Sequence, residues 1–299
     1  MSETIYLLYA FIGSFSFGLT AILLKIGMEK PNIFQGMAIR GLGSVPILIL
    51  WNIYSNGLGF YKVYTQFEIL ILVLTTSTLL LLADVFLLHI LSKKPVGVIT
   101  PIIAINPVFT TLLLLVTDEA VVTSKIIALT IVIVFGVFLV TFKSNNGGLS
   151  LKSFDIEALR YGIAIAIIWG VMNYLDILVL SNDKVEGISY SAIKFTIVSI
   201  MSLSILAIHH FDESESDPIS IRSKSFRYML IAGFIGWVAG SVLVYTSYER
   251  GNTAQIIPIV GLNPLFAIIL SIILRQEIIT KLKLLGILLC VSSSILLVL

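Results

Sequence analysis

Residues 100–109 read TPIIAINPVF, and residues 257–266 read IPIVGLNPLF. Pro101, Asn106, Pro107 and Phe109 in the first stretch recur in register in the second. Chance similarity between apolar segments does not readily give an Asn-Pro pair twice, each time with a second proline at the same distance before it. The two stretches therefore predict an internal repeat, which is the strongest signal in this chain.

The repeat extends to both sides of these stretches. Ala38-Ile39-Arg40 matches Ala192-Ile193-Lys194, and Phe17-Gly18 matches Trp169-Gly170. The chain thus divides into two homologous halves, predicted at residues 1–145 and 155–299.

The composition places both halves in a lipid bilayer. Of the 299 residues, 58% are hydrophobic and only 12% are charged, against about 25% charged in a soluble domain. This excludes soluble enzymes, nucleic-acid binders and disordered tails. The net charge of +2 gives no argument for a polyanionic partner such as nucleic acid, and the single Cys290 excludes a disulfide framework. We therefore predict a multi-pass protein of the plasma membrane.

A helix needs about 20 mainly apolar residues to cross the bilayer core. Ten stretches meet this requirement: 5–25, 33–53, 67–92, 95–116, 125–142, 159–180, 187–208, 226–247, 253–274 and 281–299. Five spans per half is an odd number, so the second half must enter the membrane in the opposite orientation to the first. The predicted fold is an all-α integral membrane protein whose ten transmembrane helices form two inverted five-helix repeats around a central cavity, an architecture that suits alternating access.

Prolines interrupt the fourth and ninth spans, where they remove backbone donors and bend the helix. Such helices usually line a protein interior or a cavity, because the freed carbonyls need partners. Asn106 and Asn263 precede these prolines, and two interpretations are open. The asparagines either present polar groups to a substrate or satisfy the backbone of the bend.

Aromatic and polar residues share one face in the sixth and eighth spans. Trp169, Asn173 and Asp176 recur at helical spacing. Trp237, Ser241, Tyr245 and Tyr248 form a similar stripe. Such faces favour a small-molecule pocket for the mid-span aromatic residues, whereas an aromatic belt at the membrane interface is the alternative and suits Tyr248 near a span end.

Ionisable residues inside spans are functional candidates because each is costly in the bilayer unless it faces an interior. They are Arg40, Asp84, His89, Asp176 and Lys194. Arg40 and Lys194 occupy equivalent places in the repeats. They either hold an anionic group of a substrate or pair with Asp84 and Asp176, and pairing is slightly favoured. Asp84 and Asp176 are also the mid-span carboxylates available to a coupling proton.

No sequence motif indicates an enzyme, a metal site or a cofactor. Nucleotide-binding, zinc-protease and serine-hydrolase motifs are absent from the sequence. His209-His210 lies beside acidic residues in a connector and is better explained by a solvated loop than by a metal site. Energy for transport would then come from an ion gradient, from exchange or from the substrate's own gradient.

The chain resembles the drug/metabolite transporter superfamily, specifically its EamA-type ten-helix members. The resemblance rests on the two five-span repeats, the Asn-Pro-Val-Phe and Asn-Pro-Leu-Phe motifs, the basic residue early in spans two and seven, and Gly286-Ile287-Leu288-Leu289 in the last span. The resemblance covers essentially the full chain. It implies a bundle whose cavity is lined by spans one, three, four, six, eight and nine, with spans five and ten at the periphery. By position, Asn106, Asn263, Trp169 and Trp237 fall on cavity-lining spans. The implied activity is secondary transport, as an exporter or exchanger, of small metabolites such as amino acids or amphipathic compounds.

Two other functional classes stay open at this point. A membrane-embedded enzyme would need acidic or histidine residues clustered near one interface, and a non-transporting subunit would have a dry, tightly packed centre. A monomer is expected because the fused repeat already supplies the two-fold partner. Lys and Arg concentrate in the odd-numbered connectors, which places both termini outside, whereas family members are expected to keep them in the cytoplasm; the orientation is left open.

Overall fold

The computed structural model describes residues 3–28, 32–94, 96–117, 122–141, 156–212, 220–274 and 281–298, and these ranges contain helices but no strand. The first half contains α1 (Glu3–Gly27), α2 (Ile33–Asn56), the 3₁₀ helix η1 (Gly57–Thr65), α3 (Phe67–Lys93), α4 (Val96–Ile103), α5 (Asn106–Thr117) and α6 (Ser124–Thr141). The second contains α7 (Ile156–Leu180), α8 (Gly187–Asp212), α9 (Lys224–Gly233), the π-helical segment η3 (Phe234–Gly240), α10 (Ser241–Arg250), α11 (Thr253–Val260), α12 (Asn263–Ile273) and α13 (Lys281–Val298).

Most of these helices are suited to a bilayer. Within the described residues, seven helical stretches are long and apolar enough to cross a membrane, and three shorter apolar helices accompany them. The shorter ones are Asn106–Thr117, Ser124–Leu139 and Leu284–Ser293. The chain is therefore a multi-pass membrane protein, while the total of ten spans stays a prediction.

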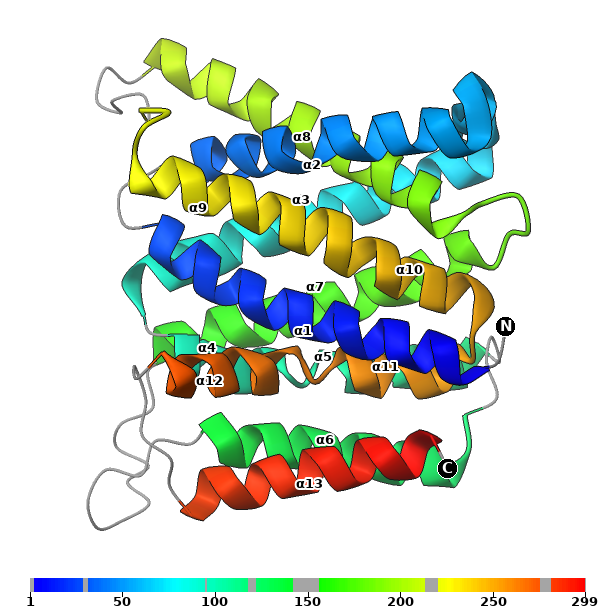
Figure 1. The fold of residues 1–299 in the computed structure, drawn as a ribbon, viewed down its shortest axis with the longest axis vertical. Coiled ribbons are helices and arrows are strands. Elements are labelled where there is room, and N and C mark those ends of the chain that lie inside the picture. Colours follow the sequence, from blue (N-terminus) through cyan, green and yellow to red (C-terminus); the bar gives the residue numbers. More distant parts are fainter. Residues whose placement is uncertain are drawn as a thin grey trace.

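The two halves run in opposite directions. The chain crosses the molecule back and forth, and α7 points the opposite way to α1 (Figure 1). The first residues of α1 and the last residues of α13 lie on one side, here called the terminal side (Figure 1). The inverted arrangement that an odd number of spans per half requires is thus seen in the helix directions.

The Asn-Pro motifs break their helices as predicted. α4 ends at Ile103 before α5 begins at Asn106, and α11 ends at Val260 before α12 begins at Asn263. Pro264 lies in the first turn of α12, where the backbone N–H that proline lacks would have no helical partner anyway. The proline therefore starts the second segment of each broken helix instead of merely bending a continuous one.

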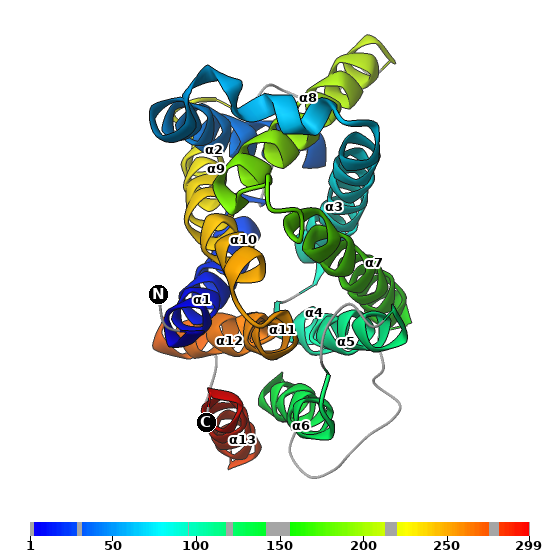
Figure 2. The same ribbon diagram turned by 90° about the vertical axis from the view of Figure 1, so that its right-hand side faces the viewer.

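The halves interlock rather than packing as separate bodies. α2 packs against α8 and α9, α3 against α7, and α1 against α12, so the main contacts join one half to the other. α6 and α13 pair with each other at the edge of the bundle, beyond the broken helices (Figure 2). The core therefore forms between the halves, around the place where the broken helices meet.

Two repeat-related glycines bring α1 and α7 against the breaks. A Cβ added to Gly18 would lie 2.7 Å from the Asn263 carbonyl oxygen, and one added to Gly170 would lie 2.5 Å from Cβ of Phe109 and 3.1 Å from the Asn106 carbonyl oxygen. Only glycine fits at such a separation. Each half thus supplies the helix that packs against the broken helix of the other half.

Candidate functional site

A central cavity of about 150 Å³ lies where the broken helices, α1, α3, α7 and the η3–α10 segment converge. Its wall is mostly apolar and contains the ends of both breaks, with Ile103 and Asn106 on one and Val260 and Asn263 on the other. None of the lining residues comes from α6 or α13. This matches the lining spans that the resemblance implies, with Arg40 of α2 and Phe195 of α8 in addition.

Both asparagines at the breaks line the cavity, and Asn106 also satisfies the backbone of its bend. The Asn106 side-chain amide donates to the carbonyl oxygen of Ile103 at 2.9 Å, which satisfies a backbone acceptor freed by the break. Asn106 and Asn263 also line the cavity, together with Asn173, whose amide nitrogen lies 3.5 Å from Oδ1 of Asn106. Satisfying the bend and facing the cavity are therefore compatible at Asn106.

Aromatic rings form a second part of the wall. Trp169, Trp237 and Tyr245 line the cavity, which agrees with the pocket interpretation of the mid-span aromatic residues. Phe195 stacks on Trp237 with ring centres 4.7 Å apart and planes 10° apart. The indole Nε1 of Trp169 is buried without a hydrogen-bond partner among the described residues. A buried donor without a partner is costly, so this N–H can bond an acceptor of a bound molecule.

Tyr248 differs from its predicted placement. The sequence suits it to a membrane-interface belt, but its side chain is buried in the protein and is not part of the cavity wall. Tyr248 lies on α10, which follows directly after η3. The π-helical turns of η3 place Trp237, Ser241 and Tyr245 together in the cavity wall. The Ser241 hydroxyl donates to the Gly236 carbonyl oxygen at 3.1 Å within this wider turn. No pattern in the sequence indicates the π segment, although π turns often occur at functional sites.

Arg40 and Asp84 form an ion pair in the cavity wall. Nη1 of Arg40 lies 2.7 Å from Oδ2 of Asp84, and both side chains are 4% exposed. The guanidinium carbon also lies 4.5 Å from the centre of the Trp237 ring, a cation–π contact. Nε of Arg40 is buried and has no hydrogen-bond partner among the described residues. The predicted pairing is thus present, and the pair also borders the cavity.

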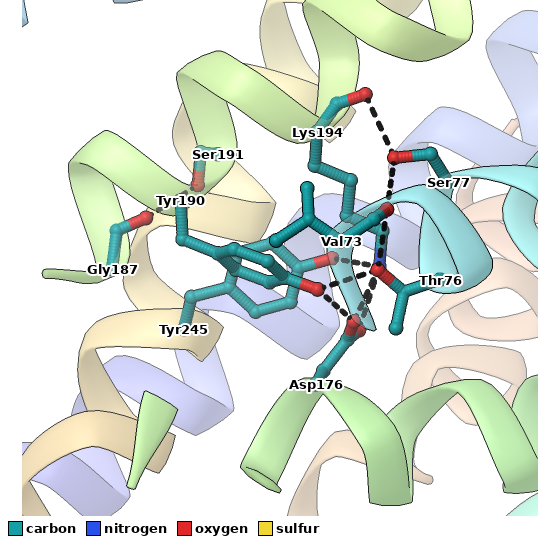
Figure 3. Close-up of polar contacts among 9 residues, drawn as sticks. All are labelled: Val73, Thr76, Ser77, Asp176, Gly187, Tyr190, Ser191, Lys194 and Tyr245. Atoms are coloured by element: carbon teal, nitrogen blue, oxygen red, sulfur yellow. Dashed lines mark hydrogen bonds and ion pairs between the residues drawn. The ribbon is translucent and has the colours of Figure 1, made fainter. Parts of the chain in front are cut away.

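Lys194 and Asp176 form a second ion pair, which is fully buried (Figure 3). Nζ of Lys194 lies 2.6 and 2.8 Å from the two carboxylate oxygens and donates to the Tyr245 hydroxyl at 3.0 Å. Tyr190 donates its hydroxyl hydrogen to Asp176, and its oxygen lies 2.8 Å from that of Thr76 on α3. We call Thr76, Asp176, Tyr190, Lys194 and Tyr245 the tyrosine–lysine network.

Of the thirteen candidate residues named from the sequence, nine line the cavity, and His89, Asp176, Lys194 and Tyr248 do not. Asp176 and Lys194 are fully buried in the tyrosine–lysine network and are not part of the wall. The positions of α2 and α8 differ in a way that separates this pair from Arg40 and Asp84. α2 and α8 start on opposite sides of the molecule, so Arg40 and Lys194, each about two turns from its helix start, approach the centre from opposite faces (Figure 1).

Other candidate groups lie away from the cavity. His89 packs its ring against Tyr161 at 5.2 Å and is not part of the wall. The side chains of His209 and His210 lie outside the described residues. No group of three or more potential metal ligands occurs in the part of the chain that the structure describes.

Phe17, Thr20 and Phe195 line the cavity, although the sequence analysis did not single them out for it. For Phe17 the repeat contained the signal, because Phe17 occupies the position equivalent to Trp169. Phe195 follows Lys194 directly, yet no pattern in the sequence indicates that it stacks on Trp237.

Comparison with known proteins gives the same architecture. The sequence profile of the EamA-like transporter family matches residues 4–142 and 158–299. A solved structure titled "Crystal structure of protein" has a TM-score of 0.73 and 12% sequence identity, covering 98% of this chain and 96% of that chain. At this identity the likeness concerns the fold alone. No curated protein matches the sequence.

Proposed function

The chain belongs to the EamA-like transporter family, and from this premise we propose that it is a secondary transporter of small organic metabolites that works by alternating access. The family consists of transporters of the drug/metabolite type and not of enzymes. Export or exchange of amino acids or other amphipathic compounds is the activity proposed, with a monomer as the working unit in the lipid bilayer.

One observation carries the proposal: a partly polar cavity lies where two inverted halves and both broken helices meet. A non-transporting subunit would have a solid apolar centre at this place. Inverted repeats support alternating access because rocking one half against the other changes the side that a central site faces.

The two ion pairs add support. The cavity reaches Arg40 and Asp84 but not Lys194 and Asp176, although the two cations are equivalent in the repeat. The bundle is therefore asymmetric about its pseudo-two-fold axis, as expected for a transporter caught facing one side. In the opposite-facing state, the repeat relation leads us to expect the cavity on the Lys194 side.

The proposal is tested with purified protein in liposomes. Radiolabelled members of a broad metabolite panel are measured for uptake and for exchange against internal substrate. We expect at least one amphipathic compound to accumulate faster than in protein-free liposomes. If correctly folded protein moved no member of the panel, the transport proposal would fail.

Tryptophan substitutions give the first prediction. Trp169→Phe keeps the ring but removes the unpartnered N–H in the cavity, so we expect the apparent substrate affinity to fall about two- to tenfold, the value of one net hydrogen bond. Trp51→Phe is the matched control because Trp51 is 42% exposed and is not part of the cavity wall. Equal effects of the two substitutions on the KM of uptake would contradict a binding role for Trp169.

A further inference from the structure

Arg40 has more donor capacity than its partner uses. Arginine carries five N–H donors, and one hydrogen bond joins its Nη1 to Asp84, while Nε is buried without a partner among the described residues. Its guanidinium lies against the Trp237 ring, so both groups face the same part of the cavity wall. A bound molecule with an acceptor group would complete this site.

The repeat-related cation offers a direct contrast. Lys194 contacts both carboxylate oxygens of Asp176 and the Tyr245 hydroxyl, and the same carboxylate also accepts from Tyr190 (Figure 3). Lysine has three N–H donors, and three acceptor oxygens are in place. The donors of Lys194 are therefore all used, and of the two repeat-related cations Arg40 is the one with a donor left for a ligand.

Charge balance decides what that ligand does to Asp84. The pair of Arg40 and Asp84 is neutral, and an anion added beside Arg40 would place two negative charges against one positive charge in a site of low dielectric constant. Two negative charges that share one site disfavour the ionised form of one of the two groups. Arginine stays charged, so a proton on the Asp84 carboxylate is the change that restores neutrality.

The charges around Asp84 leave this balance intact. Lys194 of α8 is the next cation, and Asp176 of α7 already neutralises it. On α1, Lys25 binds the carbonyl oxygen of Leu91 at the end of α3, well along the helix from Asp84. α4 has no titratable side chain. The titratable groups that interact with Asp84 from the elements around it are Arg40 of α2, Lys194 of α8 and Tyr245 of α10.

We propose that the substrate is an amphipathic organic monoanion that binds Arg40 in place of Asp84, and that Asp84 takes up one proton as it binds. This rests on the proposed transport function and names its substrate class and its coupling. The Arg40–Asp84 ion pair is replaced by an Arg40–substrate ion pair, one O–H bond forms on Asp84 with a proton from solution, and no bond of the substrate breaks. The site is neutral before and after, so anion and proton move together.

The remaining wall fits such a molecule. Trp237, Phe17 and Phe195 offer aromatic surface for an apolar body beside the guanidinium. The buried N–H of Trp169 offers a second donor to an oxygen of the substrate. A compact arene carboxylate has both features, and benzoate is a suitable probe, with benzyl alcohol as the neutral and benzylamine as the cationic analogue of similar shape.

Binding of the three probes to purified protein is measured by calorimetry. We expect benzoate to bind more tightly than either analogue, with affinity rising about tenfold for each pH unit lowered where Asp84 is ionised in the free protein, because one proton is linked to binding. Repeating the titration in buffers of different ionisation enthalpy should give an uptake of about one proton per benzoate.

Substitutions separate the two groups. Asp84→Asn should bind benzoate with an affinity that no longer changes with pH, because the amide takes up no proton. The double variant Arg40→Met with Asp84→Leu removes both charges together and should lose benzoate while still binding benzyl alcohol. The control, Lys93→Met with Glu157→Leu, removes an exposed ion pair that is not part of the cavity wall and should keep the pH dependence.

Each outcome bears on one claim. Benzoate binding that is independent of pH in the unaltered protein, a pH slope that persists in Asp84→Asn, or benzyl alcohol binding as tightly as benzoate would overturn the inference. So would absence of benzoate binding in protein that transports other members of the metabolite panel, and transport itself would then stand. Failure to transport the whole panel contradicts the transport function instead.

Discussion

The equivalent cations Arg40 and Lys194 illustrate how one residue type at one repeat position acquires two environments. Arg40 pairs with Asp84 of the third span in its own half, whereas Lys194 pairs with Asp176 of the first span in its own half. The carboxylates are not equivalent in the repeat. The basic residues thus recur at one repeat position while their carboxylate partners do not, and only the pair of Arg40 and Asp84 borders the cavity.

The buried pair gives a prediction at this scale. Lys194→Met leaves Asp176 as an uncompensated buried charge, so we expect a loss of about 3–5 kcal/mol of stability. Adding Asp176→Leu should recover most of that loss because it removes the orphaned charge. Thermal unfolding of the purified variants in detergent measures both. A single variant as stable as the unaltered protein would show that the pair is not sequestered from water.

Tyr190 provides a smaller and independent prediction within the same network. Tyr190→Phe keeps the ring against Tyr245 but removes the hydroxyl that bonds Asp176 and Thr76. We expect a loss of about 1–3 kcal/mol, because buried partners are left without a hydrogen bond. Tyr54→Phe is the control, since that side chain is 91% exposed. Equal melting temperatures for the two variants would contradict the role given to the Tyr190 hydroxyl.

At the scale of the elements, the close contacts of α1 and α7 with the broken helices hold the cavity in place. The repeat of Gly18 and Gly170 is visible in the sequence, but the contact across the halves is not. An apolar span can pack on any neighbour by composition alone. The choice of neighbour follows from the tertiary structure, where the glycines permit the closest approach.

A glycine substitution tests these contacts. Gly170→Ala places a Cβ 2.5 Å from that of Phe109, so α7 and α5 must separate; we expect a loss of about 1–3 kcal/mol and slower uptake. Gly59→Ala is the matched control because nothing lies within 4 Å of its added Cβ. Thermal unfolding and liposome uptake are compared for the two variants. An unchanged Gly170→Ala protein would mean that the break is not fixed by this contact.

At the scale of the whole molecule, the opposite directions of the halves predict which connectors share a side. η1 and the connector between α7 and α8 lie on the terminal side, and residues 220–223, just before α9, lie on the other (Figure 1). In a Cys290→Ser background, single cysteines at Leu58 and Lys184 should therefore react with a membrane-impermeant thiol reagent from the same side. A cysteine at Ile221, which is 74% exposed, should react from the opposite side only.

This labelling also settles the orientation that the charge distribution left open, because intact cells expose one side alone. If the cysteines introduced at Leu58 and at Ile221 reacted from the same side of the membrane, the inverted arrangement would be contradicted. Cys290 itself is buried against α6, so its replacement by serine is a small change in a position that the reagent does not reach.

The membrane class, the repeat, the broken helices and the main polar and aromatic residues of the cavity wall could all be predicted from the order of the amino acids. These features depend on composition and on local backbone chemistry: apolar length, a missing proline N–H, and polar residues that are too costly to face lipid. The packing of the helices was needed to show that Arg40 and Asp84 border the cavity while Lys194 and Asp176 are buried in the tyrosine–lysine network, and that Trp237 of η3 faces the site. Those outcomes depend on which helices pack together across the halves, and the periodicity of an apolar span is the same whichever neighbour it meets.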